Sequence, residues 1–288
     1  MKTKKLFNTR QLVLLGLMTA LVLIFSLTPI GSIPIGPLSI TLNVIPVAIA
    51  AIALGPVGGA VIGGVFGLFS FLQCFGVGVP SGMGAVLAEI NPFLAFVQRF
   101  IPRLLDGLLV GFIFRAVSSI KSVRGYYIIT GIVSAGFGFA LYMSGMLLLN
   151  FETNESGKSV MSVSMTDFID TPSLFIPTCI FVAGLSFGVG FLLVSSKKLS
   201  QKQVACAITG FCTALLNTIF FMTALVALFG DTEYMQNLIA GRNILMFIIA
   251  FVGVNALFEM MTTTIITAAV GPALFKAKMI PEKKTAAE

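Results

Sequence analysis

Two arginines and an aspartate occur inside an apolar stretch of the sequence, where an arginine without a paired acid could bind an anion. Arg99, Arg103 and Asp106 stand four and three residues apart within residues 93–117, which places them on one face of a helix. A guanidinium group binds a carboxylate through two parallel hydrogen bonds, so an unpaired arginine here would suit an anionic solute. The alternative is an internal ion pair between Arg103 and Asp106 that holds the helices together. Because two arginines share a helix with a single acid, we expect one guanidinium to be available to a ligand.

Further polar side chains interrupt the other apolar stretches, and each is costly in lipid unless it is paired or faces water. Asn91 and Gln98 lie on a neighbouring face of the arginine helix, and Asn217 lies in a later stretch. Asn255 and Glu259 stand four residues apart in the last stretch, so Glu259 could neutralise an arginine. We expect a pocket for a small polar solute near the outer surface. The predicted substrate-binding residues are Asn91, Gln98, Arg99, Arg103, Asn217, Asn255 and Glu259.

The sequence lacks the residues that most catalytic and metal sites use. It contains no histidine, and its four cysteines fall in apolar stretches without the spacing of a metal or redox motif. Gly157-Lys158-Ser159 resembles the end of a phosphate-binding loop, but Glu152 stands where the first glycine of that motif is required. We therefore expect no enzyme activity, no metal and no cofactor, and we expect transport or binding as the class of function.

The composition is that of a membrane protein. Hydrophobic residues make up 57% of the 288 positions and charged residues only 10%, whereas a soluble domain carries about 25% charged residues. The net charge of +7 comes from basic residues at the ends of the apolar stretches, without the interleaved aromatic residues of a nucleic-acid site. The prediction is an all-α, polytopic transmembrane bundle in the cell membrane, with no nucleic acid as partner.

Glycine, proline and polar segments divide the chain into about eight transmembrane spans, since a span needs roughly 20 residues. The predicted spans cover residues 11–30, 38–54, 57–75, 93–117, 126–149, 172–194, 204–229 and 244–271. Lysines and arginines concentrate on one side when the N-terminus is placed inside, so we expect both termini in the cytoplasm. The whole chain, 1–288, is expected to form one membrane domain.

Small residues at four-residue spacing form flat stripes on several of the predicted spans. Gly59, Gly63 and Gly67 mark the third span, and Gly16 and Ala20 mark the first. Such a stripe allows another helix to approach closely. Each stripe could serve packing inside the bundle or could dock a partner subunit, and the sequence leaves both interpretations open.

Several short motifs occur in an order that is typical of one transporter family. They are Ile35-Gly36-Pro37-Leu38-Ser39-Ile40-Thr41-Leu42, Leu54-Gly55-Pro56-x-x-Gly59, Asn91-Pro92, Ile101-Pro102-Arg103 and Leu216-Asn217-Thr218. In this order the sequence resembles the substrate-binding (S) components of energy-coupling factor (ECF) transporters, especially the pantothenate-type members. The resemblance covers roughly residues 8–120 and 203–272.

The resemblance implies a subunit that captures a vitamin or related micronutrient at the outer face of the membrane. It implies as partners a transmembrane coupling protein and two cytoplasmic ATPase subunits, with Gly16 and Ala20 on the surface that meets the coupling protein. Six spans are usual in this family, so residues 125–196 are expected to be an inserted transmembrane hairpin with an acidic extracellular loop. The chain departs from the family at Asn43-Val44, where the pantothenate-type carriers often have Met-His.

Two other functions fit parts of the sequence. A self-sufficient, proton-coupled secondary transporter could use Glu259 or Asp106 as its proton site, although the sequence has no clear inverted repeat. A membrane scaffold protein would explain the stripes of small residues but would leave the arginines without a role. The predicted function is therefore the substrate-capture subunit of an ATP-driven importer.

Overall fold

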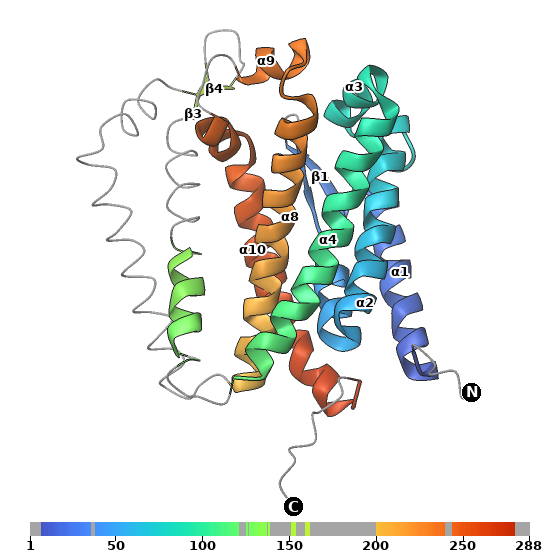
Figure 1. Ribbon diagram of the computed structural model, residues 1–288, viewed down its shortest axis with the longest axis vertical. Helices are drawn as coiled ribbons and strands as arrows, with labels where there is room; N and C mark the ends of the chain where they lie inside the picture. Colours follow the sequence, from blue (N-terminus) through green and yellow to red (C-terminus); the bar gives the residue numbers. More distant parts are fainter. Residues whose placement is uncertain are drawn as a thin grey trace, which may run out of the picture.

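Long helices that run side by side make up most of the described chain (Figure 1). The computed structural model describes residues 7–35, 38–120, 127–136, 200–239 and 244–279, with short pieces at 125, 138, 151–153 and 159–161. With the labels of Figure 1, the elements are α1 (Thr9–Leu27), β1 (Ser32–Ile35), β2 (Leu38–Thr41), α2 (Val44–Leu72), the 3₁₀ turn η1 (Gln73–Phe75), α3 (Gly82–Ile90), α4 (Pro92–Ser118), β3 (Phe151–Thr153), β4 (Ser159–Met161), α8 (Gln201–Phe229), α9 (Glu233–Ile239) and α10 (Ile244–Lys276). A short apolar helix also covers Tyr127–Gly136.

Side-chain caps determine where two of the long helices begin. The Asn8 side chain accepts a hydrogen bond from the Gln11 backbone at the start of α1, and the Gln11 side chain accepts one from the Asn8 backbone. Ser200 and Gln203 form the same reciprocal pair at the start of α8. Each pair satisfies backbone N–H groups that the first turn of a helix leaves without partners.

Helix α2 consists of two segments that meet at a sharp kink. Gly55 has a φ of 77°, a left-handed value that glycine adopts readily, and Pro56 begins the second segment. The first segment, residues 44–54, is buried along its whole length. At about 1.5 Å per residue it extends roughly 16 Å, too short for an apolar layer about 30 Å thick. The predicted span at 38–54 is therefore wrong, because residues 38–41 form a strand and the rest is an internal half-helix.

Two short antiparallel strand pairs accompany the helices, and the sequence had not predicted either of them. In the first pair, Ser32 of β1 lies opposite Thr41 of β2. This hairpin connects α1 to the buried half-helix of α2. In the second pair, Phe151 of β3 lies opposite Met161 of β4.

The second segment of α2, residues 56–72, packs against α4 with the two backbones in contact. A Cβ atom on Gly59 would overlap the Gly107 carbonyl group, and a Cβ atom on Gly63 would overlap the Arg103 carbonyl group. Only glycine permits this approach, so the stripe on this span serves packing inside the bundle. The contact also sets the position of α4, and with it that of the arginines, relative to α2.

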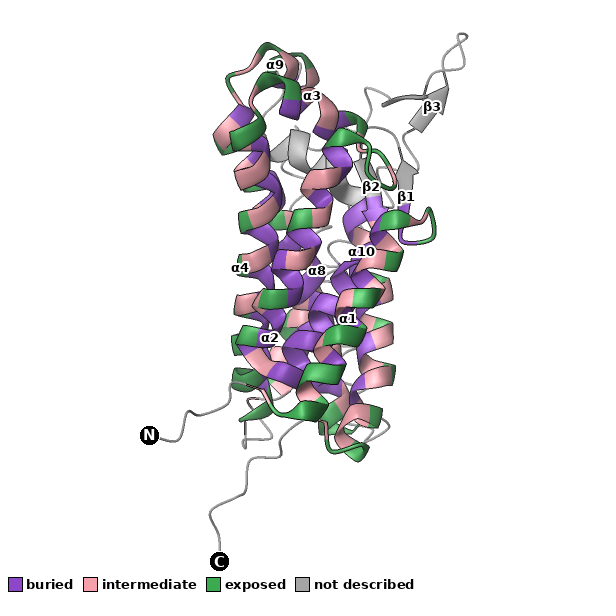
Figure 2. Cartoon of the chain, turned by 90° about the vertical axis from the view of Figure 1, so that its right-hand side faces the viewer, coloured by how far each residue is buried: buried purple, intermediate pink, exposed green. Residues whose placement is uncertain are grey.

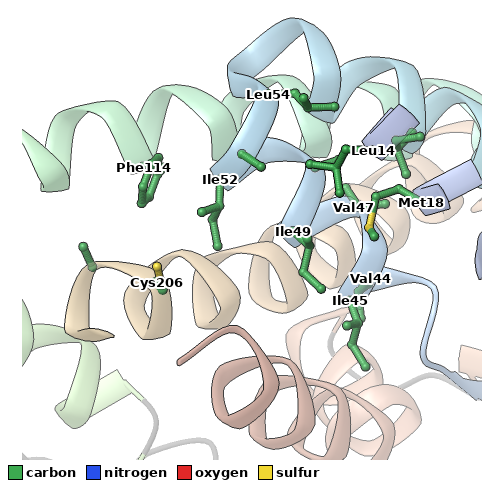
Figure 3. Close-up of a cluster of buried hydrophobic side chains, with 14 of the residues drawn as sticks. Leu14, Met18, Val44, Ile45, Val47, Ile49, Ile52, Leu54, Phe114 and Cys206 are labelled. Atoms are coloured by element: carbon green, nitrogen blue, oxygen red, sulfur yellow. The ribbon is translucent and has the colours of Figure 1, made fainter. Parts of the chain in front are cut away.

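The half-helix of α2 lies in the main hydrophobic core (Figure 3). It contributes Ile49 and Ile52, which cluster with Leu14 of α1, Phe114 of α4 and Cys206 of α8. A second cluster of buried side chains, which includes Met83, Met222, Leu225, Phe229 and Met235, lies toward α3 and α9. Contacts with α1, α4 and α8 hold the half-helix in place, and through it the hairpin that precedes it.

The outer faces of the long helices are apolar as well, which indicates a lipid environment. Buried residues follow their inner faces in Figure 2, and large hydrophobic side chains such as Val13, Ile219 and Ile265 are exposed. Within the described residues, four helical stretches are long and apolar enough to cross a membrane: α1, Val44–Phe75, α8 and Asn255–Lys276. The protein is therefore a helical membrane protein, as predicted.

The count of eight spans is not confirmed, because residues 38–54 do not form one of them. Most of residues 126–149 and all of residues 172–194 lie outside the described residues, and within them the structure shows chiefly the helix Tyr127–Gly136. The inserted hairpin expected at 125–196 and the single domain expected for 1–288 likewise stay predictions.

Two neighbouring glycines of α2 provide a matched test of its contact with α4. Gly63→Ala would place a methyl group on the Arg103 carbonyl, whereas Gly64→Ala would place one 3.7 Å from the Phe100 ring, an ordinary contact. Both changes raise helix propensity by about 1 kcal/mol, so their difference isolates the packing cost of about 1–3 kcal/mol. We expect Gly63→Ala to melt roughly 3–10 °C below Gly64→Ala in detergent. Equal melting temperatures would contradict the backbone contact.

Candidate functional site

A polar cavity lies between the β1–β2 hairpin, the loop before α3, and helices α2, α4, α8 and α10. It lies toward the end of the bundle at which α3 and α9 are found (Figure 1), and its volume is about 70 Å³. It is lined by Ser32, Thr41, Phe66, Ser70, Gln73, Val79, Pro80, Ser81, Arg99, Arg103, Asn217, Thr218, Phe221, Asn255 and Glu259. Most of these side chains are polar, in contrast to the apolar clusters around them.

Hydroxyl groups hold the Arg99 side chain in the cavity. Its Nη1 donates a hydrogen bond to Ser70 Oγ of α2 (3.3 Å), and its Nη2 donates one to Ser81 Oγ (3.0 Å). Ser81 is the N-cap residue of α3, where its hydroxyl also accepts from the Gly84 backbone. The Nε of Arg99 is buried without a hydrogen-bond partner. Neutral groups therefore orient this guanidinium and leave its charge uncompensated.

Arg103, one turn further along α4, lies against aromatic rings. Its Nη1 donates to the Gln98 backbone carbonyl (3.2 Å). Its guanidinium carbon lies 4.2 Å from the centre of the Phe221 ring and 5.4 Å from that of the Phe66 ring. The Arg99 guanidinium carbon lies 5.2 Å from the centre of the same Phe221 ring. Cation–π contacts stabilise a buried cation without neutralising it, and here one ring serves both cations.

The acidic part of the cavity belongs to Glu259 of α10. Its Oε1 accepts a hydrogen bond from the backbone N–H of Thr41 (2.8 Å), the last residue of β2. Asn217 of α8 lines the cavity together with this carboxylate, and Asn255 lines it one turn earlier on α10. The sequence allowed Glu259 to neutralise an arginine. In the described part of the chain, however, no arginine nitrogen lies within 4.0 Å of this carboxylate.

Asp106 follows Arg103 on α4 and is not among the residues that line the cavity. The ion pair considered between these two residues is not formed, because their charged atoms do not come within 4.0 Å of each other. The Arg103 guanidinium instead hydrogen-bonds to the preceding turn and stacks on Phe221. Asp106 Oδ1 is buried without a hydrogen-bond partner.

Two of the seven predicted site residues lie outside the cavity lining. The Asn91 side chain accepts hydrogen bonds from the backbone of Phe93 and Leu94, so it caps the start of α4. Gln98 is fully buried, and both of its side-chain amide atoms lack a hydrogen-bond partner. The five residues that do line the cavity are Arg99, Arg103, Asn217, Asn255 and Glu259. Their role in binding stays a prediction.

Sequence reasoning missed the hydroxyl and aromatic residues of the cavity, among them Ser70, Ser81 and Phe221. Serine and phenylalanine are common in membrane helices, so their types carried no signal. The family resemblance implied that the loop before α4's span surrounds the ligand, but only the structure showed that Ser81 of this loop lines the cavity and hydrogen-bonds to Arg99. Ser32 and Thr41 were missed because the hairpin was not predicted.

A set of buried hydrogen bonds ties the end of α1 to the cavity. Gln73, which lines the cavity, donates through its side-chain Nε2 to the backbone carbonyl of Ser26 (3.0 Å). Asn43, just before α2, donates through Nδ2 to the Ser26 hydroxyl (3.1 Å). The backbone N–H of Val79 also donates to the Ser26 carbonyl (3.4 Å). We call this set the Ser26 clasp. It anchors the loop that carries Ser81 to the last turn of α1.

The stripe of small residues on α1 lies on the outside of the bundle. Gly16 and Ala20 are both exposed, and a Cβ atom on Gly16 would meet nothing within 4 Å. Exposed apolar side chains, including Leu17 and Ile24, continue the same surface. The described chain therefore does not use this stripe for internal packing, and docking of a partner there stays a prediction.

The described helices form an apolar bundle around a charged, buried cavity, which is the architecture of a membrane protein with an internal polar pocket. The chain belongs to the family of substrate-specific components of ECF transporters, whose family model matches residues 10–161, more than half of its 288 residues. This finding confirms the family that the sequence motifs predicted. The match does not reach residues 203–272, where the resemblance stays a prediction.

One curated relative of the chain is named as a transporter. The chain is 38% identical over 112 residues to a protein named pantothenate transporter PanT, from Leuconostoc mesenteroides subsp. mesenteroides. The aligned region makes up 37% of this chain and 52% of the relative. The chain therefore matches about half the length of that relative.

The Ser26 clasp can be tested with Gln73→Met, which keeps the length of the side chain but removes its donor. Loss of a buried hydrogen bond costs about 1–3 kcal/mol when its partner is left short of a donor, and the loop at 76–81 should open more often. We expect faster hydrogen exchange in peptides that contain Ser81. Gln236→Met is the matched control, because Gln236 makes an exposed hydrogen bond to Gly230. Unchanged exchange in Gln73→Met would show that the clasp does not hold the loop.

Proposed function

We propose that this chain is the membrane-embedded, substrate-capture subunit of an ATP-driven ECF importer and that it binds an anionic vitamin or vitamin precursor. The observation that carries the proposal is the pair Arg99 and Arg103. Both guanidinium groups line one cavity, both are nearly fully buried, and neither has a carboxylate of the described chain within 4.0 Å. A buried cation without a paired acid is a strong site for a carboxylate ligand, because little water competes for it.

Pantothenate is the first ligand to test. It carries one carboxylate, and the relative that matches this chain over 112 residues is named a pantothenate transporter. The departure from the pantothenate-type pattern at Asn43 does not argue against pantothenate as the ligand. The Asn43 side chain donates a hydrogen bond to the Ser26 hydroxyl and is not part of the cavity lining. The cavity volume of about 70 Å³ is below the roughly 300–1,000 Å³ of most ligand pockets. We therefore expect the cavity to widen when the ligand binds.

The proposed partners are a transmembrane coupling protein and two cytoplasmic ATPase subunits. The family supports this part of the proposal, since its members are components of larger transporters by description. The exposed stripe with Gly16 and Ala20 is the proposed contact with the coupling protein. ATP hydrolysis would then be the task of the partners, in agreement with the incomplete phosphate-binding motif at Gly157.

The proposed orientation places both termini in the cytoplasm. The exposed basic residues Arg10, Arg115, Lys202 and Lys276 lie at the end of the bundle where α1 begins and α10 ends (Figure 1). Exposed acids of the described chain, such as Glu89, lie at the other end, near α3 and α9. Basic residues favour the cytoplasmic side of a membrane protein. The cavity would then be nearer the outer surface, where a captured solute arrives.

Arginine substitutions test the ligand site directly. Arg99→Ala and Arg103→Ala should each weaken pantothenate binding on the order of 10- to 100-fold, because each removes a charge-assisted hydrogen bond of about 1.5–3 kcal/mol. Binding is measured by isothermal titration calorimetry on the purified protein. Arg115→Ala is the control, because Arg115 is exposed near the far end of α4. Wild-type affinity in both cavity variants would refute the carboxylate site.

The docking surface can be tested with two exposed alanines. Ala20→Leu should reduce the amount of coupling protein and ATPase subunits that co-purify with the chain, because leucine fills the flat stripe on α1. Ala269→Leu makes the same change at an exposed position of α10 and should leave the complex intact. Ligand affinity should stay unchanged in both variants. Full complex formation by Ala20→Leu would contradict this docking face. Uptake by the chain alone that protonophores abolish would instead favour a secondary transporter.

A further inference from the structure

Charges of opposite sign line the cavity but are kept apart. Arg99 and Arg103 supply two positive charges and Glu259 supplies one negative charge, and all three side chains are at least 94% buried. Opposite charges in a dry interior attract strongly, so a contact ion pair would be the expected arrangement. In the described chain no such contact within 4.0 Å exists between them.

Separate sets of partners hold these charges in place. Arg99 is bound to two serine hydroxyls, and Arg103 to a backbone carbonyl and the Phe221 ring. Glu259 accepts a hydrogen bond from the Thr41 backbone, and Asn217 lines the cavity with it. None of these partners is a charged group. The cavity therefore has a cationic part on α4 and an anionic part on α10, with the ligand space beside both.

The anionic part of the cavity offers free acceptor positions for hydrogen bonds. A carboxylate offers about four acceptor positions, and the Thr41 donor uses only one of them. The Asn217 Oδ1, which belongs to the same group of residues, is buried without a partner of its own. A ligand group placed here is favoured when it donates a hydrogen bond, and a second carboxylate is repelled by Glu259.

We propose that Glu259 determines specificity: it restricts the ligand to monocarboxylates with a hydroxyl or N–H donor at the opposite end and rejects dicarboxylates. This inference rests on the proposed carboxylate site at the arginines. It assigns Glu259 a role other than neutralising them. Glu259 contacts the end of the ligand that lies away from the arginines, and the arginines bind the carboxylate that both kinds of ligand share.

Two small acids with the same four-carbon chain provide the test. γ-Hydroxybutyrate ends in a hydroxyl group and succinate ends in a second carboxylate, and both are small enough for a narrow cavity. Their dissociation constants are measured by calorimetry on the full chain in lipid nanodiscs. We expect the wild type to bind γ-hydroxybutyrate at least about 10-fold more tightly than succinate, as for a charge repulsion of about 1.4 kcal/mol.

Glu259→Gln should bring this ratio close to one, mainly through tighter binding of succinate. The glutamine Oε1 can still accept from Thr41, so the variant keeps the contact with the hairpin. Asp106→Asn is the control, because it removes a buried acid that does not line the cavity, and it should keep the wild-type ratio. Equal binding of the two acids by the wild type, or an unchanged ratio in Glu259→Gln, would overturn the role of Glu259. Binding of neither acid by the wild type would instead overturn the carboxylate site.

Discussion

The solvation of two guanidinium groups inside a membrane protein is the constraint on which the rest of the site depends. Lipid offers these groups no hydrogen-bond partners, so the protein itself has to provide them. It does so with serine hydroxyls, a backbone carbonyl and the faces of phenylalanine rings, and not with carboxylates. An ion pair would have neutralised the arginines. Neutral partners stabilise them and leave their charge available to an anion.

Close helix packing makes this arrangement possible. Ser70 and Phe66 belong to α2, and the arginines they contact belong to α4. The glycine contacts at Gly59 and Gly63 bring the two backbones together and set their relative height. A shift of one helical turn would move each guanidinium about 5 Å away from its partners. The glycine stripe thus contributes to the chemistry of the cavity although none of its residues lines it.

The cavity is also connected to the periphery of the molecule. The Ser26 clasp joins α1 to the loop that presents Ser81 to Arg99. The hairpin joins α1 to the half-helix of α2, and the Thr41 backbone at its end is bound to Glu259. Both connections start from α1, whose outer face carries exposed small and apolar residues. The cavity and the outer surface of α1 therefore share a continuous set of contacts.

The sequence by itself determined that the chain is a helical membrane protein, because lipid and span length constrain composition strongly. The order of its short motifs, by resemblance, indicated the ECF substrate-binding family. The sequence also identified five of the residues around the cavity, since buried charges and amides are rare in such helices. Only the tertiary structure decided how these residues are paired. In place of the ion pairs considered for Arg103 with Asp106 and for Glu259 with an arginine, it shows contacts to neutral groups. It also turned a predicted span into a strand and a buried half-helix. Partner choice depends on contacts between distant segments, and helical spacing within one segment contains no information about them.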